Sequence, residues 1–427
     1  MPVPNNYSEK FAVICEQTLF PLLSKEEQVF IADKAHAHRF TQQELRQICE
    51  ISRDLEMWGE RAVQQRWDKI STDSLTGKAA KKAIINQLKT DWLALKNSAT
   101  YYPTEEIAAL PSQKLKLEMR EKKQLGLGYC PVASERTRCC NLMTLDAIDN
   151  CGFDCSYCSI QAFYHEDKIF FDQGFAEKLQ ELELDPDLVY HIGTGQSSDS
   201  LLWGNKHGIL DALTAFAHAH PNVILELKTK SKNISYLLEH EIPSNIICTW
   251  SLNTPTIISN EEHRAATLND RIEAARQVAD RGIVVGFHFH PMIHYDHWEE
   301  DYSHIFQTLQ DSFKPEEVAL VSFGTLTYIK SVVKQIRQRG LKSKILQLPL
   351  IESDGKLSYS DETKLEMFTY AYQSFAQWHD EVFFYLCMEN NKLWQPVFGY
   401  AYPSNEDFEA AMKRVYISKI RAAAQRV

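Results

Sequence analysis

Three cysteines, Cys151, Cys155 and Cys158, stand within eight residues of one another with the spacing C-x3-C-x2-C. Three thiolates on one short loop can hold three irons of a [4Fe–4S] cube and leave the fourth iron without a protein ligand. An open iron can bind a small molecule through an amine and a carboxylate. A structural zinc site normally takes four ligands, and no partner pair follows at zinc-finger spacing. The segment therefore predicts an open iron–sulfur cluster rather than zinc or buried thiols.

The chain from about residue 140 onward has the pattern expected of elements that position such a loop. Short apolar runs alternate with amphipathic helical stretches such as Leu268–Arg281 and Glu299–Phe313. Strand–helix repetition indicates a parallel sheet, either doubly wound or closed toward a barrel, and about seven units favour a barrel or partial barrel. The expected strands are Leu142–Ala147, Leu188–Ile192, Val223–Leu227, Ile246–Ser251, Ile283–His288, Val318–Ser322 and Val382–Leu386.

The first part of the chain reads as helices. Apolar residues recur at helical spacing in Thr41–Gly59 and in Lys78–Asn97, and capping-box patterns start at Ser24 and Thr41. The charged stretch Leu115–Lys123 is expected to be a linker helix. We therefore predict a helical N-terminal extension over 1–125, the barrel over 126–405 and a C-terminal helix over 406–427.

The cysteine motif resembles that of the radical S-adenosylmethionine (radical SAM) superfamily, C-x3-C-x-aromatic-C, with Tyr157 at the aromatic position. Further pieces, between about residues 140 and 400, resemble the spore photoproduct lyase family in the family's order. They are 158–161 (CSIQ), 193–200 (GTGQSSDS), 227–230 (LKTK), 250–253 (WSLN), 271–275 (RIEAA), 286–288 (GFH), 298–300 (WEE), 323–326 (FGTL) and 385–389 (YLCME).

The resemblance implies an α/β fold, a partial (β/α)6 TIM-type barrel of the radical SAM kind, with the site at the C-terminal ends of the strands. It implies that Cys151, Cys155 and Cys158 hold a [4Fe–4S] cluster. S-adenosyl-L-methionine would be cleaved reductively to a 5′-deoxyadenosyl radical that abstracts hydrogen, and the family reaction is lyase-type repair of DNA thymine photoproducts. The implied partners are S-adenosylmethionine, damaged DNA and an electron donor such as flavodoxin or ferredoxin. The cofactor contacts carried over are Ser198, Asp199, Lys230, Ser251 and, more weakly, Asn253.

The sequence departs from the family at the positions that return hydrogen to the product. The loop after the second strand holds Gln196 where the family has a cysteine, and Ser159 replaces a tyrosine. O–H and amide N–H bonds are too strong to replace a thiol as hydrogen donor. Cys387 is one alternative donor, whereas Cys248 is expected to face outward because strand residues alternate and Ser251 faces inward.

Two further groups carry open alternatives. Cys130, Cys139 and Cys140 either bind a second cluster or metal or are inert thiols. His288 and His290 are two apart on a strand, so they share a face. They either line the substrate cavity, with His288 as a proton shuttle, or belong to a barrel metal-dependent hydrolase. Catalytic residues therefore stay unassigned, with Tyr157, Cys387 and His288 as candidates.

Composition narrows the remaining function classes. The 427 residues carry a net charge of −11, which argues against general nucleic-acid binding through phosphate neutralisation. Basic stretches at 228–232 and 330–344 are the candidate DNA contacts. The sequence has no apolar run long enough for a membrane span and no signal peptide at its start, so we expect a cytoplasmic protein without membrane partners. The alternatives to DNA repair are a radical SAM enzyme with a non-DNA substrate and a non-catalytic iron–sulfur protein.

Overall fold

A computed structural model of the chain describes residues 6–71, 75–103, 115–130, 136–160, 164, 168–353 and 355–425. These residues form two compact units. The helical unit comprises Met1–Tyr102 with Tyr328–Ser358, and the barrel unit comprises Pro103–Thr327 with Tyr359–Val427. This division differs from the three expected segments because residues 328–358 pack with the N-terminal helices, although they follow a barrel strand in the sequence.

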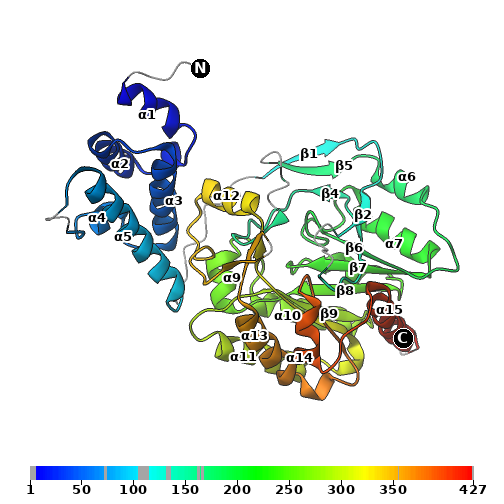
Figure 1. Cartoon of the computed structure of the whole chain (residues 1–427). Coiled ribbons are helices and arrows are strands. Elements are labelled where there is room, and N and C mark those ends of the chain that lie inside the picture. Colours follow the sequence, from blue (N-terminus) through cyan, green and yellow to red (C-terminus); the bar gives the residue numbers. More distant parts are fainter. Residues whose placement is uncertain are drawn as a thin grey trace. The chain divides into compact units, whose positions relative to one another are not determined.

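The helical unit is built mainly from α-helices (Figure 1). Both helices predicted from periodicity form, as α3 (Gln42–Trp58) and α5 (Gly77–Asn97), and Thr41 and Glu44 make the predicted reciprocal capping box. Among the described residues, no helix has both the length and the apolar character needed to cross a membrane. The other elements of this unit are α1 (Tyr7–Cys15), η1 (Phe20–Leu22), α2 (Lys25–His38), α4 (Val63–Trp67), α12 (Lys330–Arg339), β12 (Ile351–Ser353) and β13 (Lys356–Ser358).

Buried ion pairs attach α12 to the N-terminal helices. Arg337 on α12 donates two hydrogen bonds, both 2.8 Å long, to the carboxylate of Asp54 on α3. Arg53 donates from Nε to the Arg337 carbonyl at 2.9 Å. Gly340 leaves room for this arginine, because a Cβ at this left-handed position (φ 59°) would lie 1.6 Å from Arg53 Nη2. The bidentate geometry explains why residues 328–358 belong with this unit.

The barrel unit contains one curved sheet of eight strands in the order β14-β10-β9-β8-β7-β6-β3-β2. The seven strands from β14 to β3 are parallel, and β2 (Leu127–Tyr129) joins the edge antiparallel to β3. All seven predicted strands are present, so the parallel run is one strand longer than a six-strand barrel. They are β3 (Met143–Leu145), β6 (Tyr190–Thr194), β7 (Val223–Thr229), β8 (Ile246–Ser251), β9 (Val285–Met292), β10 (Val318–Thr325) and β14 (Phe383–Leu386).

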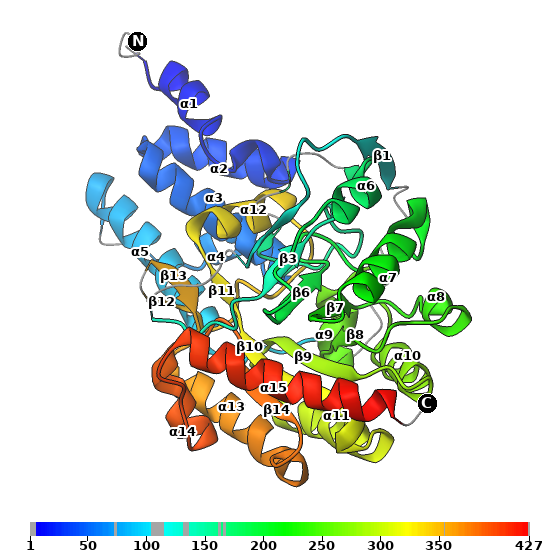
Figure 2. The same cartoon turned by 90° about the vertical axis from the view of Figure 1, so that its right-hand side faces the viewer.

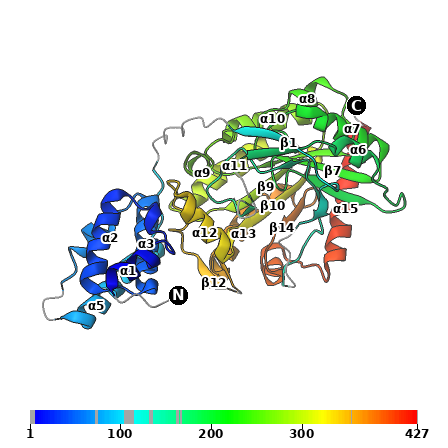
Figure 3. The same cartoon turned by 90° about the horizontal axis from the view of Figure 1, so that it is seen from above.

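Helices cover the outer face of this sheet (Figure 3). The predicted helices form as α10 (Leu268–Asp280) and α11 (Trp298–Ser312), and α10 packs on β8 and β9. The C-terminal helix α15 (Asn405–Ala424) lies at the N-terminal end of β10 (Figure 2), where Lys419 Nζ donates to the Pro315 carbonyl at 2.6 Å. The remaining elements are α6 (Phe175–Gln180), η3 (Lys206–Gly208), α7 (Ile209–Ala219), α8 (Ser235–Glu239), α9 (Pro255–Glu261), η4 (Pro315–Glu317), β11 (Thr327–Tyr328), α13 (Asp361–Ser374), η5 (Ala376–Trp378), η6 (Asn391–Leu393) and α14 (Trp394–Phe398).

The linker helix expected at Leu115–Lys123 is wrong, because β1 (Lys116–Arg120) forms there instead. It pairs in parallel with β5 (Lys168–Asp172), which also pairs with β4 (Ile148–Asp149). The charges that suggested a solvated helix are used across the strands: Lys168 forms a 2.7 Å ion pair with Glu118. Tertiary pairing has overridden local propensity, as is common for short strands.

Candidate active site

The three-cysteine loop begins directly after β4, at the C-terminal side of the barrel sheet. Two residues flanking the cysteines, Asn150 (φ 68°) and Asp154 (φ 58°), adopt the left-handed conformation that Asn and Asp tolerate best. Asn150 Nδ2 also donates to the Lys168 carbonyl on β5 at 2.6 Å. Local backbone chemistry therefore turns the chain tightly enough to bring three cysteines into one loop.

The three thiols of this loop fit a cluster that takes one thiolate on each of three irons. Burial raises the pKa of the Cys151 and Cys155 thiols, so ligation requires the positive charge of bound metal to favour the thiolates. Among the described residues, no three His, Cys, Asp or Glu side chains meet at a single-ion site. A [4Fe–4S] cube takes each thiolate on a different iron, so its cysteines need not converge on one point. The assignment of Cys151, Cys155 and Cys158 as ligands stays a prediction.

A buried carboxylate, Glu262, anchors this loop. Ser156 N donates to the Glu261 carbonyl at 2.8 Å, and Cys155 forms an isolated bridge with Glu262. The Glu262 carboxylate accepts from the Tyr157 hydroxyl and from Arg271, and it forms a 3.3 Å ion pair with Lys230 Nζ. Burial alone would raise its pKa, but Arg271, Lys230 and the Tyr157 hydroxyl together lower the pKa of Glu262 to about 2.

Two predicted site residues thus meet at one carboxylate. Lys230 Nζ also lies 5.6 Å from the centre of the Tyr157 ring, one residue from Cys158. The side chain of Lys230 is only 15% exposed, and its ion pair holds the ammonium beside the cysteine loop. Tyr157 is buried and its hydroxyl bonds Glu262, so its place is that of a support for the loop.

The loop after β6 carries the next two predicted residues, which the structure treats differently. Ser198 Oγ is buried and has no hydrogen-bond partner, which is costly for a hydroxyl unless a bound molecule supplies one. Asp199 accepts four protein hydrogen bonds, from the amides of Leu201, Leu202 and Lys230 and from Thr229 Oγ1, at 2.8 to 3.1 Å. Asp199 therefore holds this loop onto the end of β7, whereas the buried Ser198 hydroxyl has no protein partner.

The β8 residues complete the predicted cofactor set. Ser251 is the last residue of β8 and is 4% exposed. Asn253 is 1% exposed and donates to the Pro291 carbonyl at 2.9 Å, while its oxygen accepts from the Tyr302 hydroxyl at 2.7 Å. Both the nitrogen and the oxygen of the Asn253 side chain are thus used within the protein, which favours a positioning role. Cys248 lies on the opposite face from Thr249, whose hydroxyl points inward to Glu226, as alternation predicts.

A polar network that sequence reasoning missed crosses the interior of the barrel. Glu226 on β7 accepts from His191 Nε2, Thr249 Oγ1 and His288 Nε2 at 2.7 to 2.8 Å. Burial would raise its pKa, but the two imidazoles hold the pKa of Glu226 well below its usual range. The signal was present in the sequence: Glu226 is a lone carboxylate within the apolar run 223–227, and such a group is buried only with partners.

This network also engages the two histidines for which the sequence left alternatives open. His288 Nδ1 pairs with Ser322 Oγ at 2.7 Å, and that hydroxyl lies 2.9 Å from His290 Nε2. Burial, with Lys228 nearby, lowers the pKa of His288 to about 4, so the ring is neutral at pH 7. Both ring nitrogens of His288 are then used by Glu226 and Ser322, and no lone pair remains for a metal ion. The metal-dependent hydrolase reading therefore loses its central ligand, and His288 is a packed member of the network.

Several cations of the two predicted DNA-contact stretches are engaged within the protein. Lys228 and Lys230 belong to the barrel interior, and Lys232 forms a 3.1 Å ion pair with Asp270. In the second stretch, Arg337 is committed to Asp54, so it is not available to a phosphate. Lys330 of the second stretch also forms a 3.5 Å ion pair, with Glu352. DNA contact by either stretch stays a prediction.

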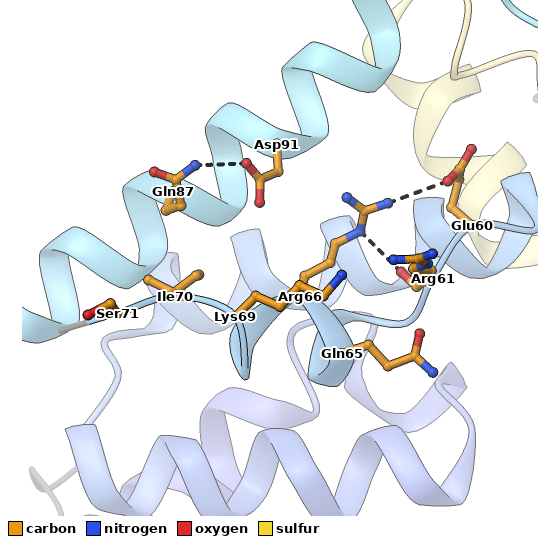
Figure 4. A pocket seen from close by; sticks show the side chains of 9 residues that line it. All are labelled: Glu60, Arg61, Gln65, Arg66, Lys69, Ile70, Ser71, Gln87 and Asp91. Carbon is orange, nitrogen blue, oxygen red and sulfur yellow. Dashed lines mark hydrogen bonds and ion pairs between the residues drawn. The ribbon is translucent and has the colours of Figure 1, made fainter. Parts of the chain in front are cut away.

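A separate cavity of about 530 Å³ lies within the helical unit (Figure 4). Its cations are partly neutralised by its own carboxylates, because Arg66 contacts Glu60 at 3.4 Å. Gln87 donates to Asp91 at 2.8 Å on the opposite wall. The lining therefore carries both charge signs, and several of its polar side chains bind one another. The lining residues are Glu60, Arg61, Gln65, Arg66, Lys69, Ile70, Ser71, Gln87 and Asp91.

Comparison with known proteins shows which proteins this chain resembles. Residues 185–376 match the spore photoproduct lyase family model. The chain is related to spore photoproduct lyases. It is 24% identical over 200 residues to the lyase of Clostridium acetobutylicum, covering 45% of this chain and 59% of that one. It is 34% identical over 94 residues to the lyase of Bacillus subtilis, and this match covers 22% of this chain and 27% of that one. The lyase-like match therefore spans about three fifths of the Clostridium relative at most.

Solved structures show that the lyase fold is shared. One is a spore photoproduct lyase mutant with bound AdoMet and dinucleoside spore photoproduct, with a TM-score of 0.52 and 17% identity, covering 75% of this chain and 88% of that one. Another is a spore photoproduct lyase complexed with dinucleoside spore photoproduct. It has a TM-score of 0.52 and 19% identity, and the match covers 64% of this chain and 82% of that one. The partial-barrel prediction is confirmed. The matched family region begins after the cysteine loop, so the cluster assignment rests on the loop's own spacing and surroundings.

Proposed function

We propose that the chain is a radical SAM enzyme that performs spore photoproduct lyase-type chemistry on a thymine photoproduct in DNA. The supporting observation is the cysteine loop, which Glu262 fixes beside the Lys230 ammonium at the C-terminal ends of the strands. A loop that only sensed redox state would not need a buried cation and an unpartnered hydroxyl beside it.

Cys151, Cys155 and Cys158 would hold the [4Fe–4S] cluster. Lys230 would pair with the carboxylate of S-adenosylmethionine, because a nearly buried ammonium is a strong partner for an anion. Ser198 Oγ, which has no protein partner, would bond the polar methionine end of the same molecule. Ser251 closes the site from β8. When bound, the cluster and S-adenosylmethionine supply the hydrogen-abstracting chemistry.

The remaining predicted residues act through their neighbours. Asp199 binds the backbone amide of Lys230 at 2.8 Å, so it sets the direction in which the lysine leaves β7. Asn253 fixes the turn after β8 through Pro291 and Tyr302. Glu262 keeps Lys230 from swinging into solvent. These three side chains would preorganise the pocket without touching the reacting atoms.

We infer the substrate class and the partners from the related proteins. A dinucleoside spore photoproduct is bound in the solved lyase structures named above, and we extend that substrate class to this chain. Reduction of the cluster requires a low-potential one-electron donor of the flavodoxin or ferredoxin class. A cytoplasmic location is part of the same proposal.

One observation favours a second candidate, a radical SAM enzyme acting on a different substrate. Gln196 occupies the loop position at which the family places its hydrogen-donating cysteine. An amide cannot give up a hydrogen atom as a thiol does. The pocket beside Gln196 is therefore chemically different from that of the family, and a different acceptor of the radical would suit it.

The substrate proposal is tested with dinucleoside spore photoproduct as probe. Anaerobically reconstituted chain, S-adenosylmethionine and dithionite are incubated with the probe, and mass spectrometry follows both the probe and 5′-deoxyadenosine. We expect the wild-type protein to convert the probe to the dinucleoside with two separate thymine bases, and Cys155→Ala to leave the probe unchanged. Formation of 5′-deoxyadenosine with the probe untouched would refute the photoproduct as substrate and favour the second candidate.

A further inference from the structure

A short strap closes the open side of the barrel. The sheet leaves β2 and β14 as its two edges, and residues 136–141 run from the β2–β3 side to the β14 side. Thr137 bridges Asn390, and Asn391 N donates to the Arg136 carbonyl at 2.9 Å. Cys139 N donates to Asn405 Oδ1 at 3.0 Å, at the start of α15.

This closure gathers four thiols at the barrel interior, from Cys130, Cys139, Cys140 and Cys387. Cys130 follows β2 and its amide donates to the Leu142 carbonyl at 3.1 Å. Cys387 follows β14, and its backbone packs closely against Gly324 of β10. A Cβ added to Gly324 would lie 2.9 Å from the Cys387 carbonyl oxygen. Cys130 and Cys139 are close enough to add to the burial that raises the pKa of Cys387 to about 12. We refer to these four residues as the interior cysteines.

One interior cysteine touches the loop that carries the cofactor residues. Gln196 Nε2 donates to Cys130 Sγ at 3.9 Å, a sulfur hydrogen bond. Gln196 follows Gly195, whose left-handed φ of 79° turns the loop so closely that a Cβ would lie 2.8 Å from Ser200 Oγ. Two residues further on is Ser198, with its unpartnered hydroxyl. Cys130 therefore borders the proposed reaction pocket although it is 66 residues away in sequence.

We propose that Cys130 is the hydrogen-atom donor that completes the reaction, reaching the pocket beside Gln196 from β2. The inference deepens the proposed function and rests on it. A hydrogen atom passes from Cys130 Sγ to a carbon-centred substrate radical: the S–H bond breaks, a C–H bond forms and a thiyl radical remains on Cys130. One electron from a low-potential one-electron protein donor and one proton from solvent return the thiol.

The other interior cysteines are poorer donors. Hydrogen bonding from Cys140 lowers the pKa of Cys139, which favours the thiolate, and a thiolate has no hydrogen to give. Cys140 is held in that same contact, where the partner thiol and burial raise its pKa. Cys387 keeps its hydrogen, but Gln196, the residue that marks the pocket, is bonded to Cys130.

The experiment uses the full reconstituted chain in D2O, where thiol hydrogens exchange for deuterium, with dinucleoside spore photoproduct as probe. Wild-type protein is expected to place one deuterium in the repaired product. Cys130→Ser, which keeps the size of the side chain but has an O–H bond too strong to break, should continue to form 5′-deoxyadenosine while losing most of the deuterated product. Cys248→Ala, on the outward face of β8, is the matched control. Cys130→Ser with unchanged deuterium incorporation, or loss of incorporation in Cys387→Ser alone, would overturn the proposal.

Two further arms separate this proposal from the function on which it rests. In Cys130→Ser, the second substitution Gln196→Cys should restore deuterium incorporation, because the new thiol lies on the neighbouring side of the same pocket. In cofactor-free protein, Gln196→Ala should speed alkylation of Cys130 by iodoacetamide, measured by peptide mass spectrometry, whereas an unchanged rate would contradict the contact. Failure of wild-type protein to consume the probe would instead refute the substrate and leave the alkylation result standing.

Discussion

Replacing Glu262 by glutamine should destabilise the barrel unit strongly. The carboxylate has an ordinary pKa of 4.5 that the structure lowers to about 2, and Glu262 is fully buried with Arg271 beside it. A shift of that size corresponds to about 3 kcal/mol of stabilisation of the charged form. The variant also leaves the Arg271 guanidinium buried without its counter-charge, a change that typically costs about 3–5 kcal/mol.

Differential scanning calorimetry of the cofactor-free chain measures this directly. For a unit of this size, with an unfolding entropy of about 2.1 cal/mol/K per residue, about 3 kcal/mol corresponds to a fall of roughly 5 °C in the melting temperature. Because the folded pKa of Glu262 is depressed, its contribution is complete above about pH 4.5 and is lost as the pH falls toward 2. The gap between wild type and variant should therefore be constant from pH 8 to 5. Glu241→Gln, at an exposed position of the same unit, is the control, and a Glu262→Gln melting temperature within about 2 °C of wild type would refute the reasoning.

Three other substitutions test further parts of the structure. Gly195→Ala should lower the melting temperature of the barrel unit through a cost of about 1–3 kcal/mol, because its φ is 79° and the new Cβ would lie 2.8 Å from Ser200 Oγ; equal melting would contradict the loop geometry. Gly340→Ala should cost a similar amount in the helical unit by displacing Arg53, measured by its own calorimetric transition. The pKa of His288 is lowered from 6.5 to about 4, so wild-type stability should fall by about 3 kcal/mol as the pH drops from 6.5 to 4. His288→Gln should flatten that fall in pH-dependent melting curves, and an unchanged slope would argue against a neutral buried ring.

Much of the barrel was predictable because its strands are buried on both faces. Each parallel strand reads as a short apolar run, and all seven runs became strands. β1 was not predictable from its own residues: Lys116–Arg120 alternates charge in a way that suits a solvated helix, and only pairing with β5 makes it a strand. Residues 328–358 likewise joined the helical unit through Arg337 and Asp54, which are 283 residues apart.

The candidate site divides in the same way. The cysteine loop was visible because its three cysteines lie within eight residues, and Lys230 because it follows a largely apolar strand. Glu262 was not visible, since it sits in the polar run 259–263 and its partner Tyr157 is 105 residues away. The contact between Gln196 and Cys130 also joins two distant segments. Sequence spacing reveals ligands that are local, while the groups that orient them are chosen by the fold.

The most direct test of the radical SAM assignment is the formation of 5′-deoxyadenosine from S-adenosylmethionine by the reduced, anaerobically reconstituted chain, measured by liquid chromatography. We expect multiple turnovers in wild-type protein and none in Cys151→Ala, Cys155→Ala or Cys158→Ala, each compared with Cys248→Ala as a control that retains activity. Wild-type protein that binds iron and sulfide but forms no 5′-deoxyadenosine, or a Cys155→Ala variant that forms it as fast as wild type, would contradict the assignment.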